Sequence, residues 1–224
     1  MQSVRIWDLP TRLFHWVLAL AVVLLVISAK VGGDAMHLHM RLGYLVFALL
    51  LFRLVWGVLG GHWSRFARFV PTPARLRAYL RGSQDATLHA GHNPLGALSV
   101  LAMLAVLSLQ VASGLFADDE IAYSGPLTTR ASHALIKLAT RYHTGPGQAL
   151  VLGLVALHVA AIVWYWRRGK NLVRPMLNGD KAMAQAVPAS RDSAGTRAAA
   201  LLILAAAAAV VYAVVQWGAR ASLG

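Results

Sequence analysis

Four histidines lie within or beside the long apolar segments of this chain. His15 lies in the first segment, and His39 precedes the second. His143 precedes the fourth segment, and His158 lies within it. An ionisable side chain in an apolar span is costly and is therefore a functional candidate, and a neutral imidazole can ligate a transition metal. We predict that these four histidines are metal ligands; the alternative is a structural, hydrogen-bonding role.

The order of the apolar segments sorts these histidines into two pairs. If each segment crosses a membrane, His15 and His158 lie towards one side and His39 and His143 towards the other. Along a regular helix, the 15 residues from His143 to His158 would rise about 22 Å. Gly145, Pro146 and Gly147 are expected to interrupt that helix. The spacing therefore predicts two bound groups at two membrane depths.

Haem suits such pairs. Two imidazoles from separate helices can saturate a haem iron axially, and a saturated iron carries electrons because it has no open position for oxygen. A zinc or copper site is the rival use, but none of these four histidines shows the i, i+3 or i, i+4 spacing that such a site favours.

Two further polar residues have competing interpretations. Arg53, in the second apolar segment, is a candidate cation for haem propionates; it could instead extend along the helix to the membrane interface. His92 is interpreted as a helix cap or interface residue rather than a ligand. Gly96 and Gly114 are interpreted as sites of close helix packing.

The composition indicates a membrane protein. Hydrophobic residues make up 58% of the 224-residue chain and charged residues 13%, against about 25% charged residues in a typical soluble domain. The absence of cysteine excludes disulfides, thiolate-bound iron–sulfur clusters and cysteine zinc sites. The net charge of +13 could suggest nucleic acid, but the basic residues lie between apolar segments, as membrane topology requires. We therefore expect membrane lipid and no nucleic acid as a partner.

Five apolar segments approach the roughly 20 residues that a membrane-spanning helix needs. They are Leu13–Ala29, Leu42–Leu59, Leu95–Ala117, Ala149–Trp166 and Ala198–Trp217. In lipid, segments of this length are helices because only a helix satisfies its own backbone. Asn93 and Pro94 form a typical start for the third helix. The first segment has no convincing cleavage site and is interpreted as a retained helix.

The connections indicate an orientation. The N-terminal piece and the loops after the second and fourth segments hold most of the Lys and Arg residues. The positive-inside rule places the N-terminus in the cytoplasm and the C-terminus outside. The tryptophans fall mainly near segment ends, as interface anchors do: Trp7, Trp16, Trp56, Trp63, Trp164, Trp166 and Trp217.

Over roughly Val4 to Lys181, the sequence resembles the bacterial cytochrome b561 family, which includes the b-type cytochrome subunits of nickel–iron hydrogenases. The resemblance is carried by Val4-Arg5-Ile6-Trp7-Asp8-Leu9-Pro10-Thr11-Arg12 leading to His15-Trp16, His39 with Gly43-Tyr44, Arg53 with Trp56, Gly91-His92-Asn93-Pro94-Leu95-Gly96, Leu157-His158-Val159-Ala160, and Asn171-Leu172 with Met176 and Gly179.

The resemblance implies a four-helix transmembrane bundle holding two haem b groups per chain, with His15, His39 and His158 as axial ligands. For the fourth ligand, His143 lies one residue further from His158 than the family spacing, and Thr144 occupies the usual position. His133 is the alternative. We predict an all-α integral membrane protein in which residues 1–181 form the dihaem bundle. Residues 182–197 are predicted to be a flexible cytoplasmic linker, and residues 198–224 an additional transmembrane helix with a short tail.

The leading hypothesis is a dihaem b-type cytochrome of the bacterial inner membrane. It would carry electrons between the quinone pool and a redox partner, such as a periplasmic c-type cytochrome or a dehydrogenase or hydrogenase subunit. One alternative is an enzyme, a superoxide oxidase that passes electrons from superoxide to quinone. Another is a non-redox membrane subunit or transporter, for which no repeat or broken mid-membrane helix is evident.

Overall fold

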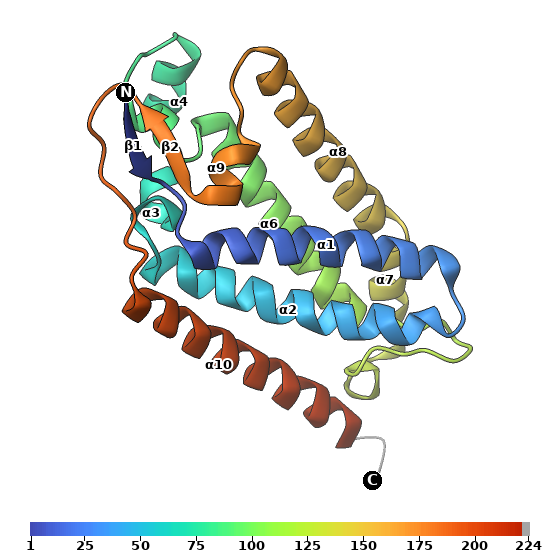
Figure 1. Ribbon diagram of the computed structural model, residues 1–224. Helices are drawn as coiled ribbons and strands as arrows, with labels where there is room; N and C mark the ends of the chain where they lie inside the picture. Colours follow the sequence, from blue (N-terminus) through green and yellow to red (C-terminus); the bar gives the residue numbers. More distant parts are fainter. Residues whose placement is uncertain (221–224) are drawn as a thin grey trace. The chain divides into compact units, whose positions relative to one another are not determined.

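The computed structural model describes residues 1–220 of the chain, and most of them are helical (Figure 1). The long helices are α1 (Leu9–Val31), α2 (Ala35–Leu59), α6 (Pro94–Leu115), α8 (Pro146–Arg167) and α10 (Ala194–Ala219). The shorter helices are η1 (His62–Ser64), α3 (Phe66–Phe69), α4 (Pro73–Leu80), α5 (Thr87–Ala90), η2 (Thr128–Arg130), α7 (His133–Thr144) and α9 (Val173–Asn178). Strands β1 (Gln2–Arg5) and β2 (Asp180–Met183) complete the elements.

The five long helices, with α7 and α8 taken together, are each long and apolar enough to cross a membrane. Four of them contain a predicted segment whole, and the third, α6, ends at Leu115, two residues before the predicted end at Ala117. Large apolar side chains on them are exposed, for example Leu20 at 61%, which is the surface that lipid requires. The chain is therefore a multi-pass membrane protein. The second helix begins seven residues before the predicted Leu42, at Ala35, because His37, His39 and Arg41 continue it on the polar side of the span.

The chain forms two compact units. Among the described residues, unit 1 contains 1–15, 53–102 and 154–203, and unit 2 contains 16–52, 103–153 and 204–220. Each long helix contributes one part of its length to each unit.

Unit 1 contains a small antiparallel sheet that the sequence did not predict. Strands β1 and β2 pair with Gln2 opposite Met183 and Arg5 opposite Asp180, and they lie side by side in Figure 1. The guanidinium of Arg5 forms an ion pair of 2.7 Å with Asp180. A hydrophobic core packs behind the sheet: Val4, Ile6, Trp7, Trp63, Ala90 and Met183. The sheet joins the two ends of the sequence region that resembles the cytochrome family, and β2 continues past the predicted boundary at residue 181.

The segment between β2 and α10 differs from the flexible linker predicted there. The backbone N–H of Ser190 donates to the carbonyl of Arg5 at 2.7 Å, and the indole of Trp63 donates to the carbonyl of Pro188 at 2.7 Å. Asp192 forms 3.0 Å ion pairs with Arg5 and Arg197. The small polar residues indicated flexibility, but they form specific hydrogen bonds to distant parts of unit 1.

Several tryptophans in unit 1 are also not the interface anchors that the sequence suggested. Trp7, Trp56 and Trp63 are buried. The indole N–H of Trp56 donates to Asp8 at 3.1 Å. Burial with a hydrogen-bonded N–H makes these side chains part of the protein core rather than contacts to lipid headgroups.

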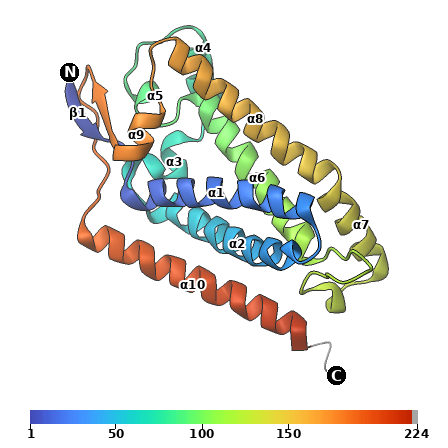
Figure 2. The ribbon, with the colours of Figure 1, turned by 45° about the vertical axis from the view of Figure 1, so that its right-hand side comes forward.

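Unit 2 is built around the α1–α2 hairpin. Residues 16–31 and 35–52 run antiparallel on either side of a tight turn (Figure 2). Gly32 and Gly33 in that turn have φ of +69° and +51°, a region that glycine occupies without steric cost. Ala21 and Val46 pack across the hairpin with Leu50.

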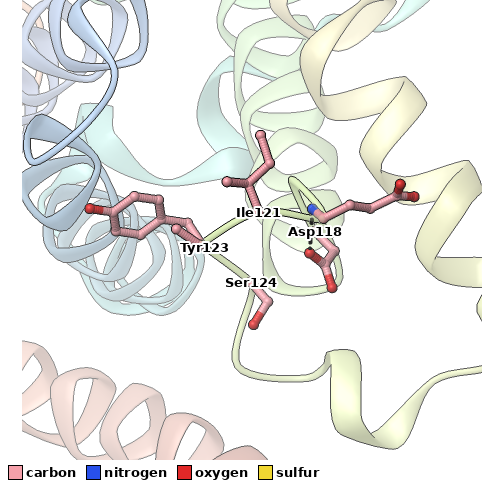
Figure 3. Close-up of a pocket in the computed structure, with 6 residues that line it drawn as sticks. Asp118, Ile121, Tyr123 and Ser124 are labelled. Carbon is pink, nitrogen blue, oxygen red and sulfur yellow. Dashed lines mark hydrogen bonds between the residues drawn. The ribbon is translucent and has the colours of Figure 1, made fainter.

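Two other features of unit 2 concern the segment before α8 and the loop after α6. Helix α7 ends at Thr144 and α8 starts at Pro146, so the predicted interruption between His143 and His158 is present. The loop around Asp118 and Asp119 borders an open surface hollow of about 360 Å³ (Figure 3). Asp119 accepts hydrogen bonds from three backbone N–H groups, those of Ile121, Ala122 and Tyr123, so its carboxylate orders the loop itself.

Candidate functional site

Unit 1 brings His15 and His158 together. His15 lies in the second turn of α1, and His158 lies in the unit 1 portion of α8. The centres of the two imidazole rings are 6.2 Å apart, and the ring planes are inclined at 53°. The two histidines are 143 positions apart in the sequence, so their contact has no local cause and depends on the packing of two separate helices.

Unit 2 brings His39 and His143 together in the same way. Their ring centres are 6.1 Å apart, with an angle of 88° between the planes. His39 lies in the second turn of α2, and His143 in the last turn of α7. Residue 133, the alternative fourth ligand, is the exposed first residue of α7, and the ring that faces His39 is that of His143.

Backbone carbonyls orient the two rings in unit 2. The Nδ1 atom of His39 lies 3.0 Å from the carbonyl oxygen of Leu25 and 3.3 Å from the Ser28 hydroxyl. The Nδ1 atom of His143 lies 2.9 Å from the carbonyl oxygen of Gln110 and 3.3 Å from the hydroxyl of Ser113. A carbonyl only accepts, so each Nδ1 must carry the proton. Each Nε2 is then left with its lone pair, as in metal-ligating histidines.

The spacing of both pairs fits one metal ion between two imidazoles. A metal–imidazole bond is about 2 Å long, and a ring nitrogen lies about 1 Å from its ring centre, so two imidazoles on opposite sides of one metal have centres about 6 Å apart. Within residues 1–220, no group of three or more His, Cys, Asp or Glu side chains could hold a metal ion. Two imidazoles from separate helices are a donor set that would suit a haem iron, whose remaining ligands the porphyrin would supply.

Gly114 leaves the space that the His143 ring occupies. A Cβ atom at position 114 would lie 2.8 Å from Cε1 and 3.2 Å from Nδ1 of His143. The side chain that packs closely against Gly114 is therefore a candidate ligand, His143. The other glycine in that prediction, Gly96, donates its N–H to Asn93 Oδ1 at 2.7 Å, which is the predicted cap of α6.

Arg53 is buried inside unit 1, with only 3% of its surface exposed. Its guanidinium lies 4.9 Å from the centre of the Phe66 ring and 5.7 Å from that of Phe69. One terminal nitrogen, NH1, is buried without a hydrogen-bond partner. The side chain therefore does not extend to the interface, which was the alternative interpretation. It stays within the protein as a cation with unused donor capacity.

A buried carboxylate that the sequence analysis did not single out fixes the start of α1. Asp8 Oδ1 accepts from the Thr11 backbone N–H at 2.8 Å and from the Trp56 indole at 3.1 Å, and its Oδ2 accepts from the Ser64 hydroxyl at 2.7 Å. Asp8 caps the N-terminus of α1 and links it to the end of α2 through Trp56. It therefore fixes the position of the first turns of α1, which include His15. An Asp two residues before Pro10 is a typical helix start in a sequence. The hydrogen bonds of Asp8 with Trp56 and Ser64 could not be predicted from the neighbouring sequence, because these partners are distant along the chain.

His92 is not the cap of α6, a role that Asn93 fills. Its half-buried ring packs against Trp7 and Phe69, with ring centres 4.7 Å and 4.8 Å away, and its Nδ1 is buried without a hydrogen-bond partner. Burial, together with the charge of Arg53, lowers the pKa of His92 to about 3, so the ring is neutral at physiological pH. This environment was not predictable from local sequence, because the packing partners of the ring lie in the β1–α1 connection and in α3.

Comparisons with known proteins identify the family of this chain. A family model described as prokaryotic cytochrome b561 matches residues 6–179. The chain is 28% identical over 130 aligned residues to a protein of Azotobacter vinelandii named probable Ni/Fe-hydrogenase B-type cytochrome subunit; the alignment covers 46% of this chain and 54% of that protein. A protein of the same name from Cupriavidus necator is 30% identical over 122 residues, which cover 42% of this chain and 50% of that protein.

The chain spans about half the length of the curated relatives that it matches. No solved structure matches it.

Proposed function

Because the chain belongs to the prokaryotic cytochrome b561 family, we propose that it is a dihaem b-type membrane cytochrome that carries electrons between the quinone pool and a redox partner. His15 and His158 ligate one haem b, and His39 and His143 ligate the other. The observation that carries the proposal is the separation of the two ring pairs, 6.2 Å and 6.1 Å, because both distances suit two axial imidazoles on one iron.

The chemistry follows from the number of ligands. When bound, haem supplies one-electron redox chemistry, and two protein imidazoles leave its iron without a position for oxygen or another substrate. The chain holds the imidazoles in place: the carbonyls of Leu25 and Gln110 accept from the Nδ1–H groups of His39 and His143. A ring held in this way would present its Nε2 in a fixed direction as a ligand for the haem iron.

Arg53 contributes electrostatics on the unit 1 side. It is buried, and the nearest carboxylate that interacts with it, that of Asp8, is already occupied by three hydrogen bonds. A propionate of the haem at the unit 1 pair is the anion that this cation can bind.

The partners follow from the membrane setting and from the relatives. Quinol and quinone are lipid-soluble electron carriers and can reach the protein within the bilayer. The names of the relatives support a hydrogenase-like dehydrogenase subunit as the second partner; a periplasmic c-type cytochrome is the other candidate. The basic loops of unit 1 support a cytoplasmic N-terminus and a periplasmic C-terminus in the bacterial inner membrane.

A haem count with single-ligand variants tests the proposal. Detergent-purified protein should contain two haem b groups per chain, show low-spin absorption spectra and be reduced by a quinol analogue. His15→Ala and His39→Ala should each lose one haem and keep the other. A wild-type protein purified without haem would end the proposal.

The fourth ligand has its own control. His143→Ala should lose the same haem as His39→Ala, whereas His133→Ala should retain both because His133 is exposed. Loss of a haem in His133→Ala, with both retained in His143→Ala, would exchange the two assignments.

A further inference from the structure

Unit 1 contains a buried polar atom without a hydrogen-bond partner that the ligand pairs do not use. His92 follows α5 and precedes α6. Its ring lies between those of Trp7 and Phe69, and its Nδ1 makes no hydrogen bond. A buried polar atom without a partner costs about 1–3 kcal/mol, so such an atom in a native protein calls for an explanation.

The second unpaired atom lies on Arg53, close to the first. Its guanidinium and the His92 ring both pack against Phe69, at 5.7 Å and 4.8 Å from the ring centre. Arg53, His15 and His158 are all near enough to His92 to act on it electrostatically. His92 and Arg53 therefore belong to one cluster beside the unit 1 histidine pair.

Lys181 holds this cluster in place and adds to its positive charge. Its ammonium donates to the carbonyl of His89 and, at 3.2 Å, to the carbonyl of Ala90, the residues that lead to His92. Lys181 lies in strand β2. The sheet therefore helps to hold the segment that leads to His92, although the two are more than 80 residues apart in the sequence.

Within residues 1–220, neither Nδ1 of His92 nor NH1 of Arg53 has a hydrogen-bond partner. Asp8, the carboxylate that acts on Arg53, already accepts bonds from Thr11, Trp56 and Ser64. Arg53, which is buried, and Lys181, which is half-buried, bring two positive charges against that one negative charge. One further anion would balance the charge and could accept from both unpaired nitrogens.

We propose that His92 and Arg53 together bind a carboxylate, which is a propionate of the haem held between His15 and His158. The inference rests on the proposed function and adds His92 as a second propionate-binding residue. Arg53 supplies a charged donor, and the neutral imidazole of His92 supplies one N–H from its Nδ1. An anion suits the site better than a neutral quinone carbonyl because two cations surround it.

The test uses the full haem-loaded chain in detergent, with the haem carboxyl carbons labelled with ¹³C. Redox-difference infrared spectra report the hydrogen bonding of the labelled carboxylates. His92→Phe keeps an aromatic ring between Trp7 and Phe69 but removes the N–H, and His92→Gln restores a donor. Arg53→Gln removes the charge. His62→Gln is the matched control, because His62 lies in the same unit on a half-exposed turn.

In His92→Phe and in Arg53→Gln, we expect a shifted carboxylate band for one haem and at least about tenfold faster release of that haem to a scavenging globin, since a hydrogen bond to a charged group contributes about 1.5–3 kcal/mol. His92→Gln should restore most of the band position, and His62→Gln should match the wild type.

Unchanged carboxylate bands in both His92→Phe and Arg53→Gln, with two haems retained, would overturn the inference while leaving the dihaem function intact. A raised KM for quinol with unchanged bands would also overturn it and would assign the donors to quinone. Equal band shifts in His62→Gln would overturn it as well, because they would show a general disturbance. Absence of haem from the wild type would instead overturn the proposed function.

Discussion

Replacing Gly114 by alanine should selectively weaken the haem proposed for His39 and His143. The new Cβ would lie 2.8 Å from Cε1 of the His143 ring, whereas carbon atoms pack best at about 3.5–4.0 Å. The ring would have to move by about 0.7 Å or more. That shift exceeds the roughly 0.2 Å by which metal–ligand distances in good sites vary, and it would also disturb the 2.9 Å bond from His143 to the Gln110 carbonyl.

The size of the effect follows from overpacking. Adding a methyl group to a well-packed site costs about 1–3 kcal/mol, which corresponds to roughly 5- to 150-fold weaker haem binding. The haem at His15 and His158 should be unaffected, because those residues belong to unit 1 and Gly114 to unit 2.

The measurement is the haem content per chain together with the rate of haem release. Gly153→Ala is the matched control: Gly153 also lies in a helix of unit 2, is exposed, and has nothing within 4 Å of an added Cβ. Both substitutions replace a helical glycine by alanine, and only the one at Gly114 meets the His143 ring. If Gly114→Ala keeps two haems and releases both as slowly as Gly153→Ala, the ring position deduced for His143 is wrong.

Two other perturbations have definite expected outcomes. Asp8→Asn should lower the free energy of unfolding by about 1–3 kcal/mol, because an amide nitrogen cannot accept the bond that Ser64 donates to Oδ2. The melting temperature should fall accordingly, and an unchanged value would show that this bond contributes little. The backbone N–H groups of Tyr123, Ile121 and Ala122 hold the pKa of Asp119 below its ordinary value. The ionised carboxylate therefore stabilises the loop at pH values above about 4, and this contribution is lost as the pH falls through the lowered pKa. Hydrogen exchange of residues 118–124 should accelerate on acidification beyond the intrinsic pH effect, and in Asp119→Asn, which keeps an acceptor without titrating, this extra change should be absent.

The membrane-spanning segments were predictable from sequence because the signal is local. A bilayer core demands about 20 apolar residues in a row, and each of the five predicted segments coincides with a long helix to within two residues or lies inside one. The start of α6 was equally local, since an Asn followed by Pro encodes a helix cap. Helix ends were less accurate: the second helix extends back to Ala35 through polar residues that hydropathy excludes from a span.

The pairing of the histidines was partly predictable. A chain that crosses a membrane repeatedly must alternate sides, and this alone placed His15 with His158 and His39 with His143 by depth. It could not decide whether the rings face one another, because the direction of a side chain depends on helix rotation. For His143 that rotation depends on the interruption at Gly145 and on contacts with Gln110 and Gly114.

What the sequence determined by itself is the class of protein, its spans and the residue type suited to its cofactor, because apolar length and imidazole chemistry belong to individual segments and residues. Only the tertiary structure decided that Trp56 is core rather than anchor, that β1 pairs with β2, and that His92 and Arg53 form one buried cluster. Each of these depends on contacts between residues separated by tens to hundreds of positions, and the burial that makes such contacts strong arises only when separate elements pack together.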